Sequence, residues 1–166
     1  MAEFDPVAIL RCLVDREVEF VVVGGVAARL RGAPLLTQDV DITPSLTRPN
    51  LERLVVALAD LQARLRTSDE PAGIPFPFDP LLIESANVWT LTTRSGDLDL
   101  AISPHGTGGF KDLIRAADRL VIALDPELVV NVASLADVIR SKEAAGRDKD
   151  RAALPLLRRT LEELDL

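Results

Sequence analysis

The sequence predicts an α/β fold in which a small mixed β-sheet is flanked by helices, and three patterns carry this prediction. Residues 19–23 and 39–43 are rich in β-branched side chains, which is typical of short strands. Residues 49–61 repeat apolar side chains at helical spacing, as a surface helix packed on a sheet does. At 166 residues the chain has the length of one ordinary domain, so we expect a single domain over residues 1–166.

In the first half of the chain, helix patterns precede and follow the strands. Residues 5–16 begin with aspartate and proline, which predicts a capped helix. The strand over residues 19–23 ends at a glycine pair, after which residues 26–31 predict a short helix. The strand over residues 39–43 and the helix over residues 49–61 come next.

The second half begins with residues 69–80, whose four prolines and one glycine predict a loop that can act as a flap. Residues 88–93 and 98–102 then predict a hairpin that turns at Ser95-Gly96-Asp97. The core of the domain is therefore expected over residues 19–103. Beyond it we expect a short helix, two brief strands and two longer helices, over residues 110–117, 120–124, 128–132, 134–145 and 148–164.

Residues 134–164 form the expected short C-terminal helical part. Ser134 and Asp137 predict a side-chain cap at its start. Pro155 lies inside the final helix pattern, and it predicts a kink or break there because proline lacks the N–H that the helix needs.

The composition excludes several kinds of site. Cys12 is the only cysteine and His105 the only histidine, which rules out an intrachain disulfide and Cys/His zinc sites and leaves oxygen atoms as metal ligands. A net charge of −7 disfavours broad electrostatic binding to nucleic acid, so any polynucleotide must be bound locally. Apolar runs such as residues 20–23 are too short to span a membrane, and we expect a cytoplasmic protein.

Two acidic residues on one strand predict a metal site. Asp39 and Asp41 are separated by one residue, so their side chains share a strand face and can hold Mg²⁺ or Mn²⁺. Gly24 and Gly25 end the preceding strand, where bare backbone can approach a phosphate and the next helix offers free N–H groups. One part of this pattern therefore predicts metal binding and the other predicts phosphate binding.

Asp99 is the expected third carboxylate. Its apolar neighbours imply a buried strand, where a carboxylate needs a partner. A metal ion bound jointly with Asp39 and Asp41 would be that partner. Asp97 is the alternative, but it lies nearer the turn, where hydrogen-bonded aspartates are common, so Asp99 is favoured.

A second cluster, over residues 141–150, is rich in charge. Lys142, Arg147 and Lys149 can neutralise a triphosphate, with Asp150 orienting one of them. A solvent-exposed connection between two helices has the same composition. Taken by itself, this segment is therefore compatible with phosphate binding and with a purely structural connection.

Four motifs together carry a family resemblance: Gly24-Gly25, Thr37-x-Asp39-x-Asp41, Leu98-Asp99-Leu100 and Lys142-x4-Arg147-x-Lys149-Asp150. In this combination the chain resembles the polymerase-β-type nucleotidyltransferase superfamily, and within it the AbiEii-like branch that includes the MenT-type toxins. The resemblance runs from about residue 19 to residue 160. It implies the nucleotidyltransferase fold.

The resemblance also implies a role for each motif. The catalytic carboxylates and metal ligands would be Asp39, Asp41 and Asp99, with Asp99 as the base. The nucleotide-binding residues would be Gly24, Gly25, Thr37, Lys142, Arg147 and Asp150. The implied reaction transfers a nucleoside monophosphate from an NTP to a hydroxyl and releases pyrophosphate. The implied acceptor is the 3′ end of tRNA, and the implied partner is the cognate antitoxin of a toxin–antitoxin system.

Two other functions stay open at this point. The same reaction can modify a protein or a small molecule such as an aminoglycoside. A catalytically idle nucleotide-binding module on the same fold is the other alternative. Three converging acids would repel one another without metal, and this argues against an idle module.

Overall fold

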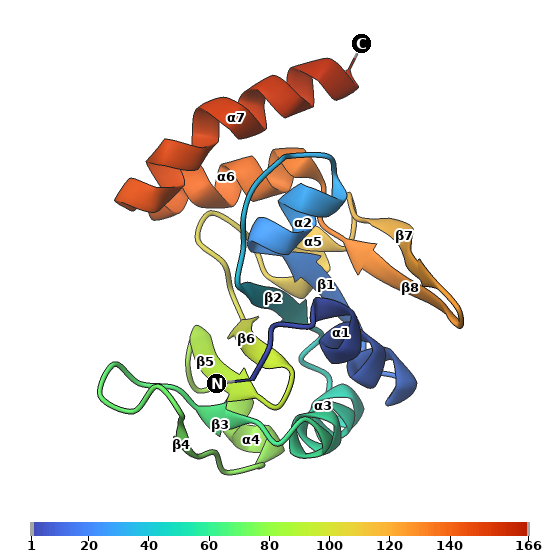
Figure 1. Ribbon diagram of the computed structural model, residues 1–166, viewed down its shortest axis with the longest axis vertical. Helices are drawn as coiled ribbons and strands as arrows, with labels where there is room; N and C mark the ends of the chain where they lie inside the picture. The colour runs from blue at the N-terminus through green and yellow to red at the C-terminus, as the bar shows by residue number, and fades with distance from the viewer. Residues whose placement is uncertain (1, 166) are drawn as a thin grey trace.

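The computed structural model describes residues 2–165, which form an α/β structure around one eight-stranded mixed sheet (Figure 1). The predicted α/β class is confirmed, and the sheet is larger than the small sheet expected. The strands are β1 (Phe20–Val23), β2 (Asp39–Pro44), β3 (Arg64–Leu65), β4 (Ile74–Pro75), β5 (Val88–Thr93), β6 (Gly96–Ala101), β7 (Asp118–Leu124) and β8 (Glu127–Val132).

Seven helices accompany the sheet in the described part of the chain. Most lie close to their predicted ranges. They are α1 (Pro6–Asp15), α2 (Gly24–Leu30), α3 (Arg48–Asp60), α4 (Pro80–Ile83), α5 (Phe110–Leu113), α6 (Leu135–Ala145) and α7 (Asp148–Leu164).

The strand order β4-β3-β5-β6-β2-β1-β8-β7 puts β6 and β2 at the centre of the sheet. β2 runs parallel to β6, and β1 runs parallel to β8, whereas the other neighbouring pairs are antiparallel. In the β2–β6 pair, Asp39 lies opposite Asp97 and Asp41 lies opposite Asp99. This register brings two strands with predicted site residues side by side.

Along β2 and β6, aspartates alternate with apolar residues, so this part of the sheet has one apolar face and one acidic face. Val40 and Leu98 lie between the aspartates in sequence and are fully buried, and α1 contacts both strands. The aspartates point to the other face, where α2 starts beside Asp41. Helix α6 packs on α2, and α7 packs on α6, so these helices stand on the acidic side (Figure 1).

The predicted helix caps and the predicted hairpin are confirmed. Asp5 Oδ1 accepts a hydrogen bond of 3.0 Å from the Ala8 N–H at the start of α1. Ser134 Oγ accepts one of 3.1 Å from the Asp137 N–H at the start of α6. Each such cap stabilises a helix by about 1 kcal/mol. β5 and β6 form the expected antiparallel hairpin.

The structure changes two of the predicted elements and adds a strand that was not predicted. The helix expected over residues 110–117 covers only Phe110–Leu113, because β7 starts at Asp118 and pairs with β8. The loop expected over residues 69–80 contains the short strand β4 and the first residue of α4. β3 was not predicted, since a strand of two residues leaves no alternating pattern to recognise.

Two helices differ from the prediction at glycine and proline. α2 begins at Gly24 itself rather than at residue 26, so the glycine pair forms the first turn of the helix. α7 continues through Pro155, so the break that was one of the two expected outcomes does not occur there. Pro155 is exposed, so water can replace the missing N–H at the carbonyl one turn earlier. Over residues 2–165, no helix is both long and apolar enough to cross a membrane.

A fully buried asparagine ties the start of β1 and the end of β2 to α3. Asn50 Oδ1 accepts a hydrogen bond of 2.7 Å from the Glu19 N–H. Asn50 Nδ2 donates to the Glu19 and Ser45 main-chain oxygens, at 2.9 and 2.7 Å. Because all of these groups are paired, the buried amide stabilises the junction.

We predict that Asn50→Leu lowers the free energy of unfolding by about 2–4 kcal/mol, because it leaves the backbone groups of Glu19 and Ser45 unpaired. Urea unfolding measures this change. Arg48→Gln, on the exposed first turn of the same helix, is the control and should change stability by less than about 0.5 kcal/mol. Equal stability of Asn50→Leu and wild type would contradict the prediction.

Candidate functional site

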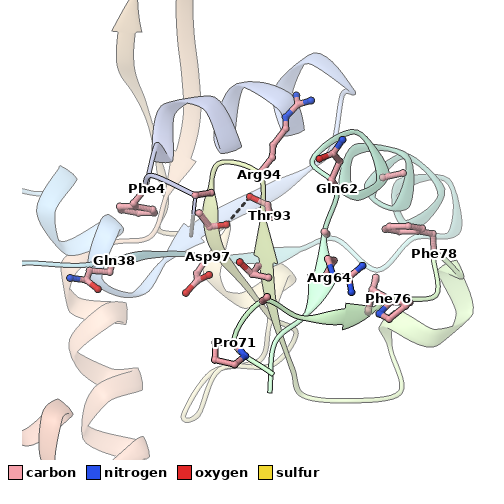
Figure 2. A pocket seen from close by; sticks show the side chains of 17 residues that line it. Phe4, Gln38, Gln62, Arg64, Pro71, Phe76, Phe78, Thr93, Arg94 and Asp97 are labelled. Atoms are coloured by element: carbon pink, nitrogen blue, oxygen red, sulfur yellow. Dashed lines mark hydrogen bonds between the residues drawn. The ribbon is translucent and has the colours of Figure 1, made fainter. Parts of the chain in front are cut away.

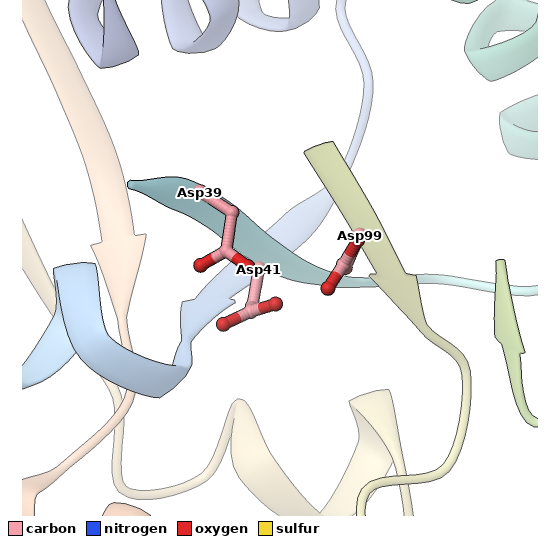
Figure 3. A group of neighbouring side chains, drawn as sticks. All are labelled: Asp39, Asp41 and Asp99. Carbon is pink, nitrogen blue, oxygen red and sulfur yellow. The ribbon is translucent and has the colours of Figure 1, made fainter. Parts of the chain in front are cut away.

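Three carboxylates from two central strands converge at one point of the acidic face. Asp39 and Asp41 extend from β2 and Asp99 from β6, and Figure 3 shows them pointing toward one another. One oxygen from each lies within 4.8 Å of the others. Asp97, the alternative third carboxylate, is not in this group, and its Oδ2 lies 3.5 Å from Arg66 Nε instead.

Like charge and burial disturb the titration of two of these carboxyls. Burial, followed by the negative charges of Asp39 and Asp99, raises the pKa of Asp41 to about 8. Burial and the charge of Asp39 raise the pKa of Asp99 to about 6, although the nearby Arg66 opposes this shift. The ionised form of the group is therefore unfavourable without a cation.

The donor set fits a hard divalent cation. Mg²⁺ binds carboxylate oxygens at about 2.1 Å, so two ligands of one ion lie within about 4 Å of each other. The three oxygens are already within 4.8 Å, and small side-chain rotations bring them to that spacing. A bound cation would also relieve the repulsion that raises the pKa values of Asp41 and Asp99.

Gly24 is required by the carboxylate group itself. Its φ is +66°, which disfavours a side chain, and a Cβ atom there would lie 2.1 Å from Asp41 Oδ2 and would displace that carboxylate. A Cβ on Gly25 would lie 3.0 Å from Thr37 Oγ1. That hydroxyl lies 3.1 Å from the Asp39 main-chain oxygen and 3.3 Å from Asp39 Oδ1 and can donate to either. The glycine pair therefore lets α2 begin directly against the first residues of β2.

All of the residues proposed from sequence line one cleft of about 750 Å³ between the carboxylates and helices α6 and α7. They come from segments that are far apart in the chain. They are Gly24, Gly25, Thr37, Asp39, Asp41, Asp99, Lys142, Arg147 and Asp150.

An ionic network around one buried carboxylate, Asp150, lines the cleft from the side of α6 and α7. Asp150 is fully buried, and its carboxylate accepts from Arg147 Nε at 2.7 Å and from Lys142 Nζ at 3.4 Å. Burial raises the pKa of this carboxyl, but the hydrogen bond and charge of Arg147, together with Lys142, outweigh burial and lower it. Lys149 also lines the cleft and is exposed. This wall therefore presents cations to the cleft.

Arg31, at the end of α2, fixes the start of α6 relative to the sheet. Its guanidinium donates to the main-chain oxygens of Val132 and Ala133, at 2.8 and 3.0 Å, just before α6 begins. It also donates to Asp118 Oδ2 at 2.7 Å. The helix that carries Lys142 is thus held at a set distance from α2.

Sequence reasoning missed several polar residues of this region. His105, Thr107 and Ser141 also line the cleft. His105 precedes Gly106, whose backbone packs so closely on α6 that a Cβ would meet Ala144 Cβ at 2.7 Å. Nothing in the sequence pattern marks His105 and Thr107, because the packing of their loop on α6 is a tertiary contact. Ser141 lies in the charge-rich segment 141–150 but was not named as a site residue.

Comparison with known proteins adds no relative: no protein-family model matches the chain, and no curated protein matches it either.

We predict that the metal-free protein loses stability as pH rises from about 4 to about 8. The pKa of Asp41 is raised from 3.8 to about 8 in the folded state, so in this interval the folded chain keeps a proton that the unfolded chain releases. Asp41→Asn carries no charge and should be roughly 1–3 kcal/mol more stable than wild type at pH 8 without metal.

Thermal melts at pH 5 and pH 8, in chelator and then in excess Mg²⁺, measure this effect. Mg²⁺ should stabilise wild type and leave Asp41→Asn nearly unchanged. Asp69→Asn, in an exposed loop, is the control. Parallel pH profiles for wild type and Asp41→Asn in chelator would show that the carboxylates do not repel one another.

We predict that Asp150→Ala lowers the free energy of unfolding by roughly 2–4 kcal/mol, because it leaves Lys142 and Arg147 without their buried counter-ion. Asp148→Ala, in the same first turn but 97% exposed, should have little effect. Urea unfolding of both variants makes the comparison, and equal losses would contradict the role given to Asp150.

Proposed function

We propose that this protein is a metal-dependent nucleotidyltransferase with a polymerase-β-type fold. The observation that carries the proposal is the pairing of walls in one cleft: three carboxylates on the sheet and three cations, Lys142, Arg147 and Lys149, on the opposite side. A nucleoside triphosphate with its metal ion is anionic along its phosphates and cationic at the metal. It is therefore complementary to both walls at once.

The central strands support the fold assignment. An Asp-x-Asp strand lies parallel to the strand of the third carboxylate, and a glycine pair opens the helix beside them. These are the motifs on which the resemblance to the polymerase-β-type superfamily rests. Their convergence in space gives that resemblance a geometric basis.

Each wall has its own part in the reaction. Asp39, Asp41 and Asp99 would hold Mg²⁺ or Mn²⁺, which stabilises charge on the attacking and leaving oxygens of an in-line transfer. Gly24, Gly25 and Thr37 line the cleft beside the carboxylates, where they would adjoin the phosphates.

Asp99 would act as the base, the role that the family resemblance implies for it. In this role its carboxylate would accept the proton of an acceptor hydroxyl. The hydroxyl oxygen then bonds to the α-phosphorus, and the bond from the α-phosphorus to the pyrophosphate oxygen breaks. Lys142 and Arg147 neutralise the charge on the departing pyrophosphate.

The acceptor proposed is the 3′ hydroxyl of tRNA, in a toxin controlled by a cognate antitoxin. This assignment rests on the resemblance to the AbiEii-like branch. A protein hydroxyl or a small molecule are the competing acceptors, and a labelling experiment separates them.

The test is incubation of the protein with Mg²⁺, each α-labelled NTP in turn and bulk tRNA, followed by denaturing gels. Label on tRNA supports the proposal, and label on protein would replace tRNA by a protein acceptor. Chelation of the metal should abolish transfer. Absence of label on any acceptor, together with no metal-dependent NTP binding, would refute nucleotidyl transfer.

We predict that Asp41→Asn lowers transfer by at least about 10³-fold, because it removes a charged metal ligand. Lys142→Gln should raise the KM for NTP by about 10-fold, because it removes a charged contact to phosphate. Lys111→Gln, on α5 and outside the cleft, is the matched control and should behave as wild type. Full activity of Asp41→Asn would contradict the proposed metal site.

A further inference from the structure

Arg66, the residue after β3, reaches the carboxylates from two strands away. Its N–H donates a hydrogen bond of 2.9 Å to the main-chain oxygen of Thr90 on β5. Thr90 in turn lies opposite Asp99 on β6. The Arg66 side chain therefore extends across β5, and its guanidinium ends beside two carboxylates of β6, those of Asp97 and Asp99.

The guanidinium lies between these two carboxylates and is fully paired with neither. Arg66 Nη2 lies 3.4 Å from Asp99 Oδ1, and Arg66 Nε lies 3.5 Å from Asp97 Oδ2 without a hydrogen bond. Hydrogen bonds from arginine to a carboxylate are normally about 2.7–2.9 Å long. Within residues 2–165, Arg66 Nε is the buried side-chain nitrogen that lacks a hydrogen-bond partner. A small shift toward Asp97 would give this nitrogen its partner.

Two other arginines of the protein form short ion pairs, so the long distances are a property of the Arg66 site. Arg147 Nε lies 2.7 Å from Asp150 Oδ2, and Arg31 Nη1 lies 2.7 Å from Asp118 Oδ2. Among the described residues, each of these two guanidiniums pairs with one carboxylate, whereas Arg66 is shared between two. Competition between two partners accounts for the intermediate position of its guanidinium.

The two carboxylates that share Arg66 have different surroundings. Asp99 lies with Asp39 and Asp41, one oxygen of each within 4.8 Å of the others, and it lines the nucleotide cleft. Asp97 is outside that group and lines a second cavity, of about 910 Å³ (Figure 2). In the described part of the chain, Arg66 is the side-chain cation that forms an ion pair with the carboxylate group. A metal ion bound at Asp99 would therefore compete with Arg66 for the same carboxylate.

We propose that Asp97 is a positioning residue for metal binding, because it draws Arg66 away from Asp99 when a divalent cation binds there. With Asp99 bound to a cation, the guanidinium loses its attraction to that carboxylate and completes a hydrogen bond to Asp97 instead. Asp97 thus favours metal binding without being a ligand. This inference rests on the metal site of the proposed nucleotidyltransferase, and it gives a role to the acidic residue that the site leaves out.

Partial burial makes the exchange of partners large enough to measure. The side chains of Arg66, Asp97 and Asp99 are 30%, 32% and 20% exposed, so water screens their charges less than it does at an open surface. The presence or absence of either Arg66 or Asp97 should therefore change the affinity of the carboxylate group for a cation.

The test is a double-mutant cycle on Mn²⁺ affinity, with Arg66→Gln, Asp97→Asn and the double variant beside wild type. Titration with Mn²⁺ alone, followed by electron paramagnetic resonance of the free ion, gives the Kd without any turnover. Asp69→Asn removes a charge from the exposed loop after Arg66 and is the matched control for Asp97→Asn. Melting temperatures in chelator establish that all variants fold.

Arg66→Gln is expected to bind Mn²⁺ about 3–10-fold more tightly than wild type, because the competing cation is gone. Asp97→Asn is expected to bind it about 3–10-fold more weakly, because Arg66 then pairs with Asp99 alone. In the Arg66→Gln background, the same Asp97→Asn change should alter the Kd by less than about 2-fold. Asp69→Asn should bind Mn²⁺ as wild type does.

Unchanged or weaker Mn²⁺ binding by Arg66→Gln would overturn the inference, because it would show that Arg66 does not compete for Asp99. An equal loss of affinity on Asp97→Asn in both backgrounds would also overturn it and would make Asp97 a metal ligand. Both outcomes leave the metal site, and with it the proposed nucleotidyl transfer, intact. If wild type itself binds no Mn²⁺, the metal site fails and the proposed function fails with it.

Discussion

Repulsion among three neighbouring carboxylates is the constraint on which the rest of the structure depends. Asp39, Asp41 and Asp99 place like charges within 4.8 Å of one another, where burial weakens screening by water. The arrangement persists because the parallel register of two central strands fixes it and because Gly24 leaves room for the Asp41 side chain. Burial of apolar side chains on the other face of the same strands offsets this repulsion. Alternate residues there, such as Val40, are fully buried.

The cations across the cleft complement this acidic cluster but are positioned in a different way. Backbone pairing positions the carboxylates, whereas one buried side chain, Asp150, positions Lys142 and Arg147. The cations of this wall therefore depend on a carboxylate that has no solvent contact of its own. The two walls derive from separate parts of the chain, and the cleft exists only after α6 has docked on α2.

Local pattern was sufficient for most strands and helices, and for the choice of residues that line the cleft. Apolar neighbours favoured Asp99 over Asp97 beside the turn, and Asp99 is the one that lies with Asp39 and Asp41, although both carboxylates are close to Arg66. Local sequence pattern was insufficient for elements whose formation depends on tertiary contacts. Arg66 lies next to a two-residue strand that has no sequence period, and the effect of Pro155 depended on which side of α7 faces water. The sequence pattern explained Gly24 only by the close approach of a phosphate. The structure adds a second reason, because the Asp41 carboxylate occupies the space next to Gly24.

Arg31 affects the shape of the cleft without belonging to the charged residues that line it. Its guanidinium donates to the main-chain oxygens of Val132 and Ala133, so the link does not depend on the chemistry of those two buried side chains. A change at position 31 would shift α6 and alter the width of the cleft without replacing any charged residue that lines it. Among diverging descendants of this chain, the size of the accepted ligand can thus evolve at one position while the reactive groups stay the same.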